Sequence, residues 1–149
     1  MKKIILPLLF LLLNPQQLFA SEFPVKIKPV HKISTSNLDL KEGDSLEFVT
    51  SEAVLINSKP YINKGELVTA TVTSLEDNGY LAQPAKLYLE NFRTVSAKNT
   101  PIKLKGIIYK SGNDHRVFGE VFTFQFLRGG EVHITPEKDE FTIYVEENL

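Results

Sequence analysis

Alternating apolar and polar residues make up most of the chain beyond residue 37, in short runs separated by turn-forming residues. The run ELVTATVTSL (66–75) alternates most strictly and places Thr69, Thr71 and Thr73 between apolar positions. Successive side chains of a β-strand point to opposite faces. This run therefore predicts a strand with one apolar face and one hydroxyl-bearing face.

About nine segments of this kind follow one another, with turn signals about every 8–12 residues, as in an all-β sandwich or barrel. The run AKLYLENF would tolerate a helix by composition, but its alternation and its shortness favour a strand. The expected fold class is therefore all-β, a small antiparallel barrel or sandwich. The segments are SLEFVT, AVLIN, ELVTATVTSL, AKLYLENF, TVSA, PIKLKGIIYK, RVFGEVFTFQFL, VHIT and EFTIYVEE.

Three of these strands follow the same kind of turn. The stretches LKEGDSLEF, INKGELVTA and TPEKDEFTIYV each carry a small turn, then an acidic residue, then an alternating strand. Gly43 and Gly65 suit turns in which φ must be positive. Lys138 stands where the third turn would have a glycine, so that turn is expected to be wider. Convergent turn chemistry and an internal repeat both explain the likeness. Further turns are expected at 57–60 and at Asn78-Gly79.

The first 20 residues, MKKIILPLLFLLLNPQQLFA, have the layout of a secretory signal peptide. Two lysines precede an apolar run at 4–13, and a polar stretch leads to Ala20 before a cleavage site at Ser21. A membrane span needs about twenty apolar residues, so the run predicts export with cleavage instead of an anchor. The mature chain is expected to be periplasmic or associated with the cell envelope, with no transmembrane segment.

Residues 21–37 are expected to form an extended N-terminal arm ahead of an all-β domain at 38–149. Pro24 and Pro29 each remove a backbone donor, which favours an arm or an edge strand. Such an arm could add as a strand to the sheet of a partner. The apolar positions of the arm that would take part are Val25, Ile27 and Ile33.

Charge and cysteine content narrow the classes of partner. Loss of the leader lowers the number of basic residues from 17 to 15 against 18 acidic ones, a net charge of −3. Nothing in this balance attracts nucleic acid, so no nucleic-acid partner is expected. The chain has no cysteine, which excludes disulfides, thiolate metal sites and a lipid anchor on an N-terminal cysteine.

The histidines and carboxylates do not form a recognisable catalytic motif. Asp114 directly precedes His115, and adjacent side chains of a strand point to opposite faces, so Asp114 would not orient His115. No G-x-S-x-G elbow presents a serine. A metal at His133 would need His115 together with Glu131 or Glu120, and no H-x-H or H-E-x-x-H spacing supports such a site. We therefore expect no enzyme activity, no metal and no cofactor.

A series of motifs in chain order resembles a known family. The motifs are EGDSLEFVTSEAVLIN, PYINKGELVTATV, AKLYLENFRTV, IKLKG and TPEKDEFTIYVEENL, within roughly residues 38–149. They resemble uncharacterised exported bacterial β-proteins and, more distantly, the C-terminal β-barrel domain of TrbI-like channel components of type IV secretion systems. Thr69-Ala70 stands where that family usually has a glycine, and the closing proline-glycine is Pro136-Glu137 here. The resemblance implies a β-barrel or sandwich made for protein contact and does not imply a channel.

The expected function is a non-enzymatic protein-binding or assembly module of the cell envelope. Its partner would be another envelope protein, and homo-oligomers are also compatible with the sequence. The arm and the threonine row Thr69, Thr71 and Thr73 are the expected contact surfaces. The alternative is a periplasmic carrier that holds a small apolar ligand or lipid in a phenylalanine-lined cavity. The same phenylalanines also suit a packed core, which is the preferred prediction. They are Phe118, Phe122, Phe124 and Phe126.

Overall fold

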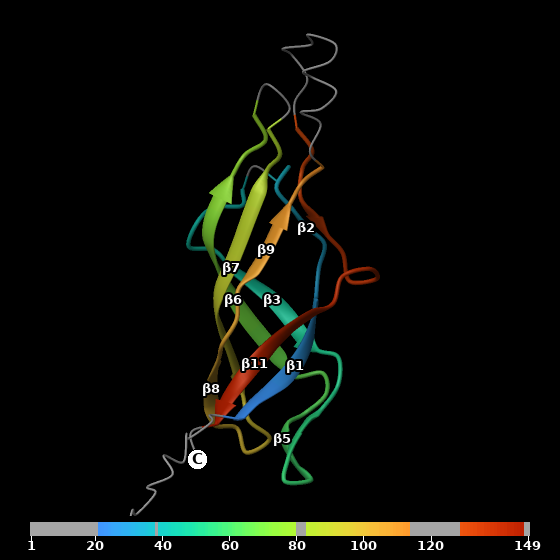
Figure 1. Ribbon diagram of the computed structural model, residues 1–149, viewed down its shortest axis with the longest axis vertical. Coiled ribbons are helices and arrows are strands. Elements are labelled where there is room, and N and C mark those ends of the chain that lie inside the picture. The colour runs from blue at the N-terminus through green and yellow to red at the C-terminus, as the bar shows by residue number, and fades with distance from the viewer. Residues whose placement is uncertain (1–20, 38, 80–82, 114–128, 148–149) are drawn as a thin grey trace, which may run out of the picture.

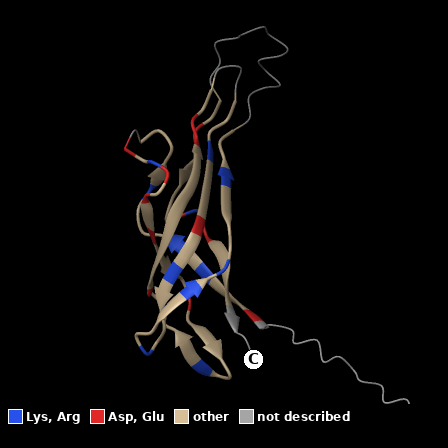
Figure 2. Ribbon diagram, turned by 90° about the vertical axis from the view of Figure 1, so that its left-hand side faces the viewer, with Lys and Arg blue, Asp and Glu red and all other residues tan. Residues whose placement is uncertain are grey.

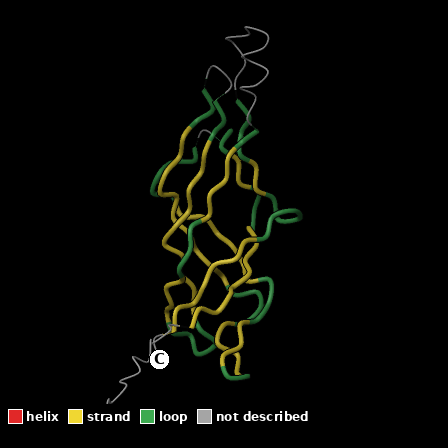
Figure 3. The backbone as a smooth tube through the Cα atoms, viewed as in Figure 1, coloured by secondary structure: helices red, strands yellow, loops and turns green. Residues whose placement is uncertain are grey.

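The computed structural model describes residues 21–37, 39–79, 83–113 and 129–147. This part of the chain contains eleven strands and no helix (Figure 3), so the expected all-β fold is confirmed. The strands are β1 (Ser21–Pro29), β2 (Ile33–Ser34), β3 (Ser45–Thr50), β4 (Val54–Ile56), β5 (Lys59–Ile62), β6 (Leu67–Glu76), β7 (Lys86–Val95), β8 (Pro101–Leu104), β9 (Ile108–Ser111), β10 (His133–Ile134) and β11 (Phe141–Glu147).

Seven strands form one antiparallel sheet in the order β11-β1-β3-β6-β7-β8, with β9 also paired to β7. Two small sheets complete the fold, one of β2 with β10 and one of β4 with β5. The molecule is elongated, with the β4–β5 hairpin at one end (Figure 1).

The large sheet curls until its two ends meet. Lys105, directly after β8, forms a bridge with Tyr144 of β11. The N–H of each residue donates to the carbonyl of the other at 2.8 Å. These two hydrogen bonds make the sheet a nearly closed, barrel-like structure.

The interior of the barrel is filled by apolar side chains from alternate strand positions. Along β6, Val68, Ala70 and Val72 are buried, as the alternation predicts. Phe48 of β3 and Phe92 of β7 are the largest fully buried side chains. Burial of one such ring stabilises the fold by about 1.5–3 kcal/mol. Other fully buried side chains are Val25, Ile27, Ile62, Leu87, Leu89, Ile134 and Ile143.

The N-terminal strand β1 lies inside the sheet, and the expectation of a separate arm at residues 21–37 is wrong. Residues Ser21 to Ile27 pair with β11, and Ile27 to Pro29 pair with β3. β1 therefore has a hydrogen-bonded neighbouring strand along each of its two edges.

The prolines of β1 occupy positions where a donor is not needed. The Lys26 carbonyl accepts from the N–H of Ser51, and the Val30 N–H donates to Glu47, so even-numbered positions face β3. Pro24 faces β3 before that pairing begins, and Pro29 faces β11 beyond its last pair. Proline is tolerated in sheets at such unpaired positions. The prolines therefore correctly indicate two positions without a backbone hydrogen bond. They do not indicate that β1 as a whole is an edge strand.

A β-bulge in β7 resets which side chains face inward. Thr69 pairs with Arg93 but Thr71 pairs with Glu90, so β7 has one more residue than β6 across this interval. The extra residue, Asn91, has a φ of 55°. Without it, the two-residue period would direct Phe92 to the solvent.

The third of the three related turns is wider, as its sequence predicts. In the first turn the Asp44 carboxylate accepts from the Lys41 N–H, three residues back, at 2.8 Å. In the third turn the Asp139 carboxylate accepts from the Thr135 N–H, four residues back, at 2.8 Å. The glycines of the first two turns have positive φ, 91° at Gly43 and 78° at Gly65.

The other two turn signals each join antiparallel strands. Asn57 and Ser58 form the two-residue turn between β4 and β5, with φ values of 51° and 62°. Asn78-Gly79 lies between β6 and β7, as predicted, but the connection from Glu76 to Lys86 is longer than a two-residue turn.

The filled interior predicts a large difference between two leucines, Leu89 of β7 in the large sheet and Leu55 of β4 in the small β4–β5 sheet. Leu89→Ala removes a fully buried side chain and should lower the free energy of unfolding by about 2–5 kcal/mol. Leu55→Ala removes a side chain that is 55% exposed and should change it by no more than about 0.5 kcal/mol. Urea unfolding of both variants measures this, and equal losses would contradict the packing described.

Candidate functional site

The structure does not leave the apolar residues of the expected arm available to a partner. Val25 and Ile27 are fully buried in the barrel, and Ile33 of β2 is buried against the paired Ile134 of β10. These three residues belong to the core, so the prediction that they bind a partner is corrected.

The threonine row is interrupted by a second bulge. Thr69 and Thr71 face outward and half-buried, opposite Glu47 and Ser45 of β3. The register between β6 and β7 shifts at Thr73, whose hydroxyl donates to the Tyr88 carbonyl at 3.5 Å. The three residues therefore do not form one continuous outer face.

The predicted phenylalanine cavity lies outside the described residues. Phe118, Phe122, Phe124 and Phe126 all fall within 114–128, as does His115. The choice between core and cavity for this row therefore stays a prediction.

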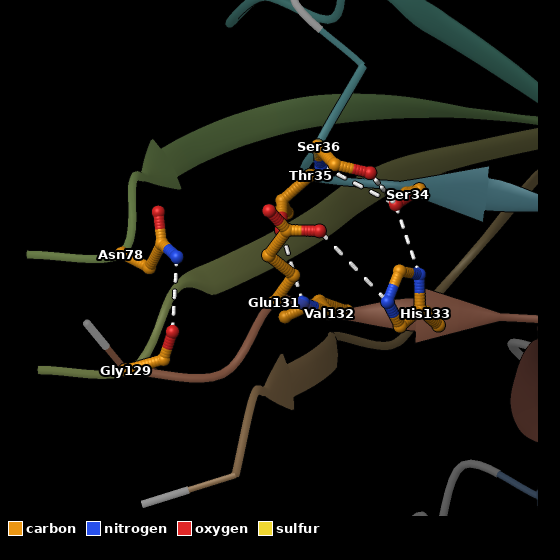
Figure 4. A network of polar contacts seen from close by, with 8 residues as sticks. All are labelled: Ser34, Thr35, Ser36, Asn78, Gly129, Glu131, Val132 and His133. Atoms are coloured by element: carbon orange, nitrogen blue, oxygen red, sulfur yellow. Dashed lines mark hydrogen bonds and ion pairs between the residues drawn. The ribbon is translucent and has the colours of Figure 1, made fainter. Parts of the chain in front are cut away.

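A polar cluster joins the two strands of the small β2–β10 sheet (Figure 4). The hydroxyl of Ser34 lies 2.9 Å from Nδ1 of its register partner His133 and 2.6 Å from the hydroxyl of Ser36. A carboxylate oxygen of Glu131 lies 3.9 Å from Nε2 of the same histidine. Thr35 fixes the pair of strands further, since its hydroxyl accepts from the Val132 N–H at 2.9 Å.

This cluster places a serine, a histidine and a carboxylate in a row, which is the order of a hydrolase triad. A working triad needs hydrogen-bond contacts of about 2.6–3.2 Å on both sides of the histidine. The Glu131–His133 distance of 3.9 Å is too long, and His133 is exposed to solvent. We interpret the cluster as a contact that fixes the pairing of β2 and β10. Among the described residues, no group of three or more His, Cys, Asp or Glu side chains could hold a metal ion.

A groove of about 490 Å³ runs beside this cluster, between β2, the following loop and β3. Ile33, Leu40 and Leu46 supply apolar lining, and His31, Ser34 and Glu47 supply polar lining.

The most distinctive region of the barrel is the line along which its sheet closes, between β9 and β11, which we call the seam. Beyond the Lys105–Tyr144 bridge the two strands separate. The Lys110 ammonium then spans the seam, at 2.8 Å from the Asp139 carboxylate and 5.4 Å from the centre of the Phe141 ring. Backbone hydrogen bonds thus close the first part of the seam, and side-chain contacts connect its two sides beyond that point.

Gly106 allows the close approach of the two strands at the start of the seam. A Cβ atom on Gly106 would lie 2.8 Å from Cγ2 of Ile143, which is closer than real Cβ contacts. Any larger residue would therefore push β11 away from the bridge.

The charge state of Asp139 depends on this arrangement. Burial of the carboxylate, whose side chain is 16% exposed, favours the neutral form. The hydrogen bonds from Lys110 and from the Thr135 N–H outweigh this effect and lower the pKa of Asp139 below its ordinary value of 3.8. Asp139 is therefore charged and paired at neutral pH.

β9 has one paired edge and one unpaired edge. The Gly112 N–H donates to Ala85, beyond β7, so even-numbered residues of β9 face β7. The backbone groups of Ile107, Tyr109 and Ser111 point to the seam by the two-residue period. No backbone hydrogen bond joins them to any described segment there. Within the described residues, this edge therefore presents backbone donors and acceptors that have no backbone partner.

Large apolar side chains are exposed beside this edge. Ile107 is 65% exposed, Tyr109 49% and Tyr144 37%. The ring of Tyr109 packs against that of Tyr88 on β7, with 4.7 Å between the centroids. We call Tyr88, Ile107, Tyr109 and Tyr144 the seam strip.

The seam strip was not predicted from the sequence, although one feature of the sequence indicates it. In the run GIIYK, two successive isoleucines of one strand cannot both face the core. The structure buries Ile108 and exposes Ile107.

The chain matches no known protein-family model, and no curated protein is significantly similar to it. The resemblance to TrbI-like domains therefore stays a prediction. None of the described residues forms a helix that is long and apolar enough to cross a membrane.

The seam ion pair predicts a specific pH dependence of stability. A lowered folded pKa stabilises the protein above pH 3.8, and this contribution is lost as the pH falls through the folded value. Asp139→Asn keeps an acceptor for the Thr135 N–H but removes the charge. Urea unfolding should show Asp139→Asn less stable than the wild type at about pH 7, with a smaller difference at about pH 3.

The matched control is Asp77→Asn, at an exposed position between β6 and β7. Because Asp77 is exposed, its replacement should change the free energy of unfolding by no more than about 0.5 kcal/mol. A stability loss for Asp139→Asn that is the same at both pH values would contradict the role of the ion pair.

Proposed function

We propose that this protein is an exported, non-enzymatic module that binds another protein of the cell envelope or assembles with it. The observation that carries the proposal is the edge of β9 that has no strand partner among the described residues, beside the exposed seam strip. Unpaired strand edges are templates for pairing with another chain, and proteins usually cover or charge them. Here the edge is flanked by Ile107 and Tyr109 instead.

Strand addition is the binding mode that this surface supports. An extended partner segment would pair with the backbone groups of Ile107, Tyr109 and Ser111. Its outward side chains would contact the seam strip, since side chains of neighbouring strands on one face lie about 4.5–5.5 Å apart. Main-chain hydrogen bonds would supply affinity, and the side-chain contacts would supply specificity.

The carrier alternative has less support. A carrier needs an apolar cavity, and the described interior is filled by Phe48, Phe92 and their aliphatic neighbours. The groove of about 490 Å³ beside β2 is open and is lined by polar as well as apolar groups. We therefore favour the protein-binding function, in agreement with what the resemblance to TrbI-like domains implies. Thr69 and Thr71, on the outer face of β6, also remain candidate contacts for a partner protein.

Site-specific crosslinking tests the proposed surface. In cells that make the protein, p-benzoylphenylalanine at Ile107 should form a defined adduct with a partner chain. The same residue at Leu55, which is 55% exposed on β4, is the matched control and should form none. Adducts of equal yield from both positions, or from neither, would contradict the proposal.

A second pair of variants tests whether the backbone edge takes part. The N–H of Ser111 faces the seam, so Ser111→Pro removes this donor while Ser111→Ala keeps it. Combined with the crosslinker at Ile107, Ser111→Pro should lower partner affinity about 2- to 10-fold relative to Ser111→Ala, the value of one hydrogen bond. Equal affinities would argue for binding through side chains alone.

We also propose that the leader is removed at Ser21. This is compatible with the fold, because cleavage before Ser21 would leave intact every pair that β1 forms with β11, from Ser21–Glu147 to Ile27–Phe141. N-terminal sequencing and intact-mass measurement of the envelope fraction should find a chain that begins Ser21-Glu22-Phe23. Recovery from the cytosol of a chain that keeps Met1 would contradict the proposal of export.

A further inference from the structure

A hollow of about 250 Å³ opens on the outside of the barrel where the partners of β7 change. β7 pairs with β8 through Phe92–Val95 and with β9 through Lys86–Leu89. Between these ranges Glu90 and the bulge residue Asn91 lie opposite the crossing segment 105–107. The hollow lies in this fork.

Three basic side chains line the fork, and two of them, Arg93 and Lys103, form no ion pair with an acidic side chain of the described residues. Arg93 of β7 pairs in register with Lys103 of β8, so two like charges lie directly opposite each other. Within the described residues, no carboxylate forms an ion pair with either of them. Lys105 lines the same hollow and binds Glu22 at 3.0 Å, and Glu90 is the one acidic residue of the lining.

This arrangement is unfavourable for the isolated chain. Like charges directly opposite on neighbouring strands destabilise a sheet. The full chain has a net charge of −1, so a local excess of positive charge does not follow from its composition. Figure 2 shows several Lys and Arg positions gathered on neighbouring strands in the lower half of the barrel.

We propose that the fork binds a carboxylate of an extended, acidic partner segment, which lies along the unpaired edge of β9. This inference rests on the proposed protein-binding function and adds the chemistry of the partner. Arg93 can hold a carboxylate through two parallel hydrogen bonds, and Lys103 adds a second charge opposite it.

The continuity of the surface favours a peptide over a phosphate. Ile107 lines the hollow and also begins the seam strip, so one ligand would contact both. A free phosphate would use only the basic groups. A peptide strand would also pair with the backbone of Ile107 and Tyr109, and its alternate side chains would reach Tyr109 and Tyr144.

The test uses two synthetic peptides of about nine residues, one alternating valine with glutamate and the other alternating valine with glutamine. Both can add as strands, and they differ only in charge. In fluorescence anisotropy at low salt, the mature chain should bind the glutamate peptide about tenfold or more tightly, as charge-assisted hydrogen bonds predict. Arg93→Gln/Lys103→Gln should abolish this difference and leave binding of the glutamine peptide unchanged.

Two controls separate charge recognition from unfolding and from general attraction. Lys98→Gln removes an exposed charge from the turn between β7 and β8 and should keep the preference for glutamate. The double variant should unfold at the same or a higher temperature than the wild type, because it removes a like-charge pair.

Three other outcomes would contradict the inference about an acidic partner. Each can be distinguished from a failure of the proposed protein-binding function. Equal affinity for the two peptides would remove the acidic specificity while strand addition stands. Inorganic phosphate that displaces the glutamate peptide without affecting the glutamine peptide at millimolar concentration would make the fork an anion site for small ions. Binding of neither peptide, together with a positive crosslink from Ile107, would mean that the partner is recognised by other chemistry.

Discussion

The barrel depends on one pair of backbone hydrogen bonds, those between Lys105 and Tyr144. They join the two ends of a curled sheet, and without them β8 and β11 would be free edges. The contact is possible because Gly106 lets Ile143 approach. Closure is short, however, and β9 and β11 separate directly beyond it. The Lys110–Asp139 ion pair holds the remaining part of the seam through side chains alone.

The candidate binding surface follows from this incomplete closure. Where the ladder stops, the outer backbone groups of β9 have no partner among the described residues, and the side chains beside them are large and apolar. The fork arises in a related way, because β7 exchanges one partner strand for another at the Asn91 bulge. Both features are places where the sheet changes pairing. Such places leave polar backbone unpaired, and a partner chain can use it.

The strand content could be predicted from the sequence, but the pairing of the strands could not. Alternation located β6 and β7, and turn chemistry located the turns at Gly43, Gly65 and Asn57-Ser58. The bulges at Asn91 and Thr73 depend on register, which a single strand does not specify. Two prolines suggested an edge position for β1, although β1 has neighbouring strands on both sides. The sequence alone does not show which residues of a strand are paired, so it could not show that these prolines lie at unpaired positions. The seam strip depends on which residues of distant segments meet, and only the doubled isoleucine hinted at it.

The pairing of the first strand with the last has a consequence for the order of folding. Phe23 of β1 lies opposite Val145 of β11, so the barrel cannot close until nearly the whole chain is available. Contacts between such distant positions form slowly, since a long loop must be ordered first. In a chain threaded through an export channel N-terminus first, β1 would emerge without its neighbour on one side. If this chain is exported as proposed, its barrel would therefore close only after the C-terminal strand has also passed the membrane.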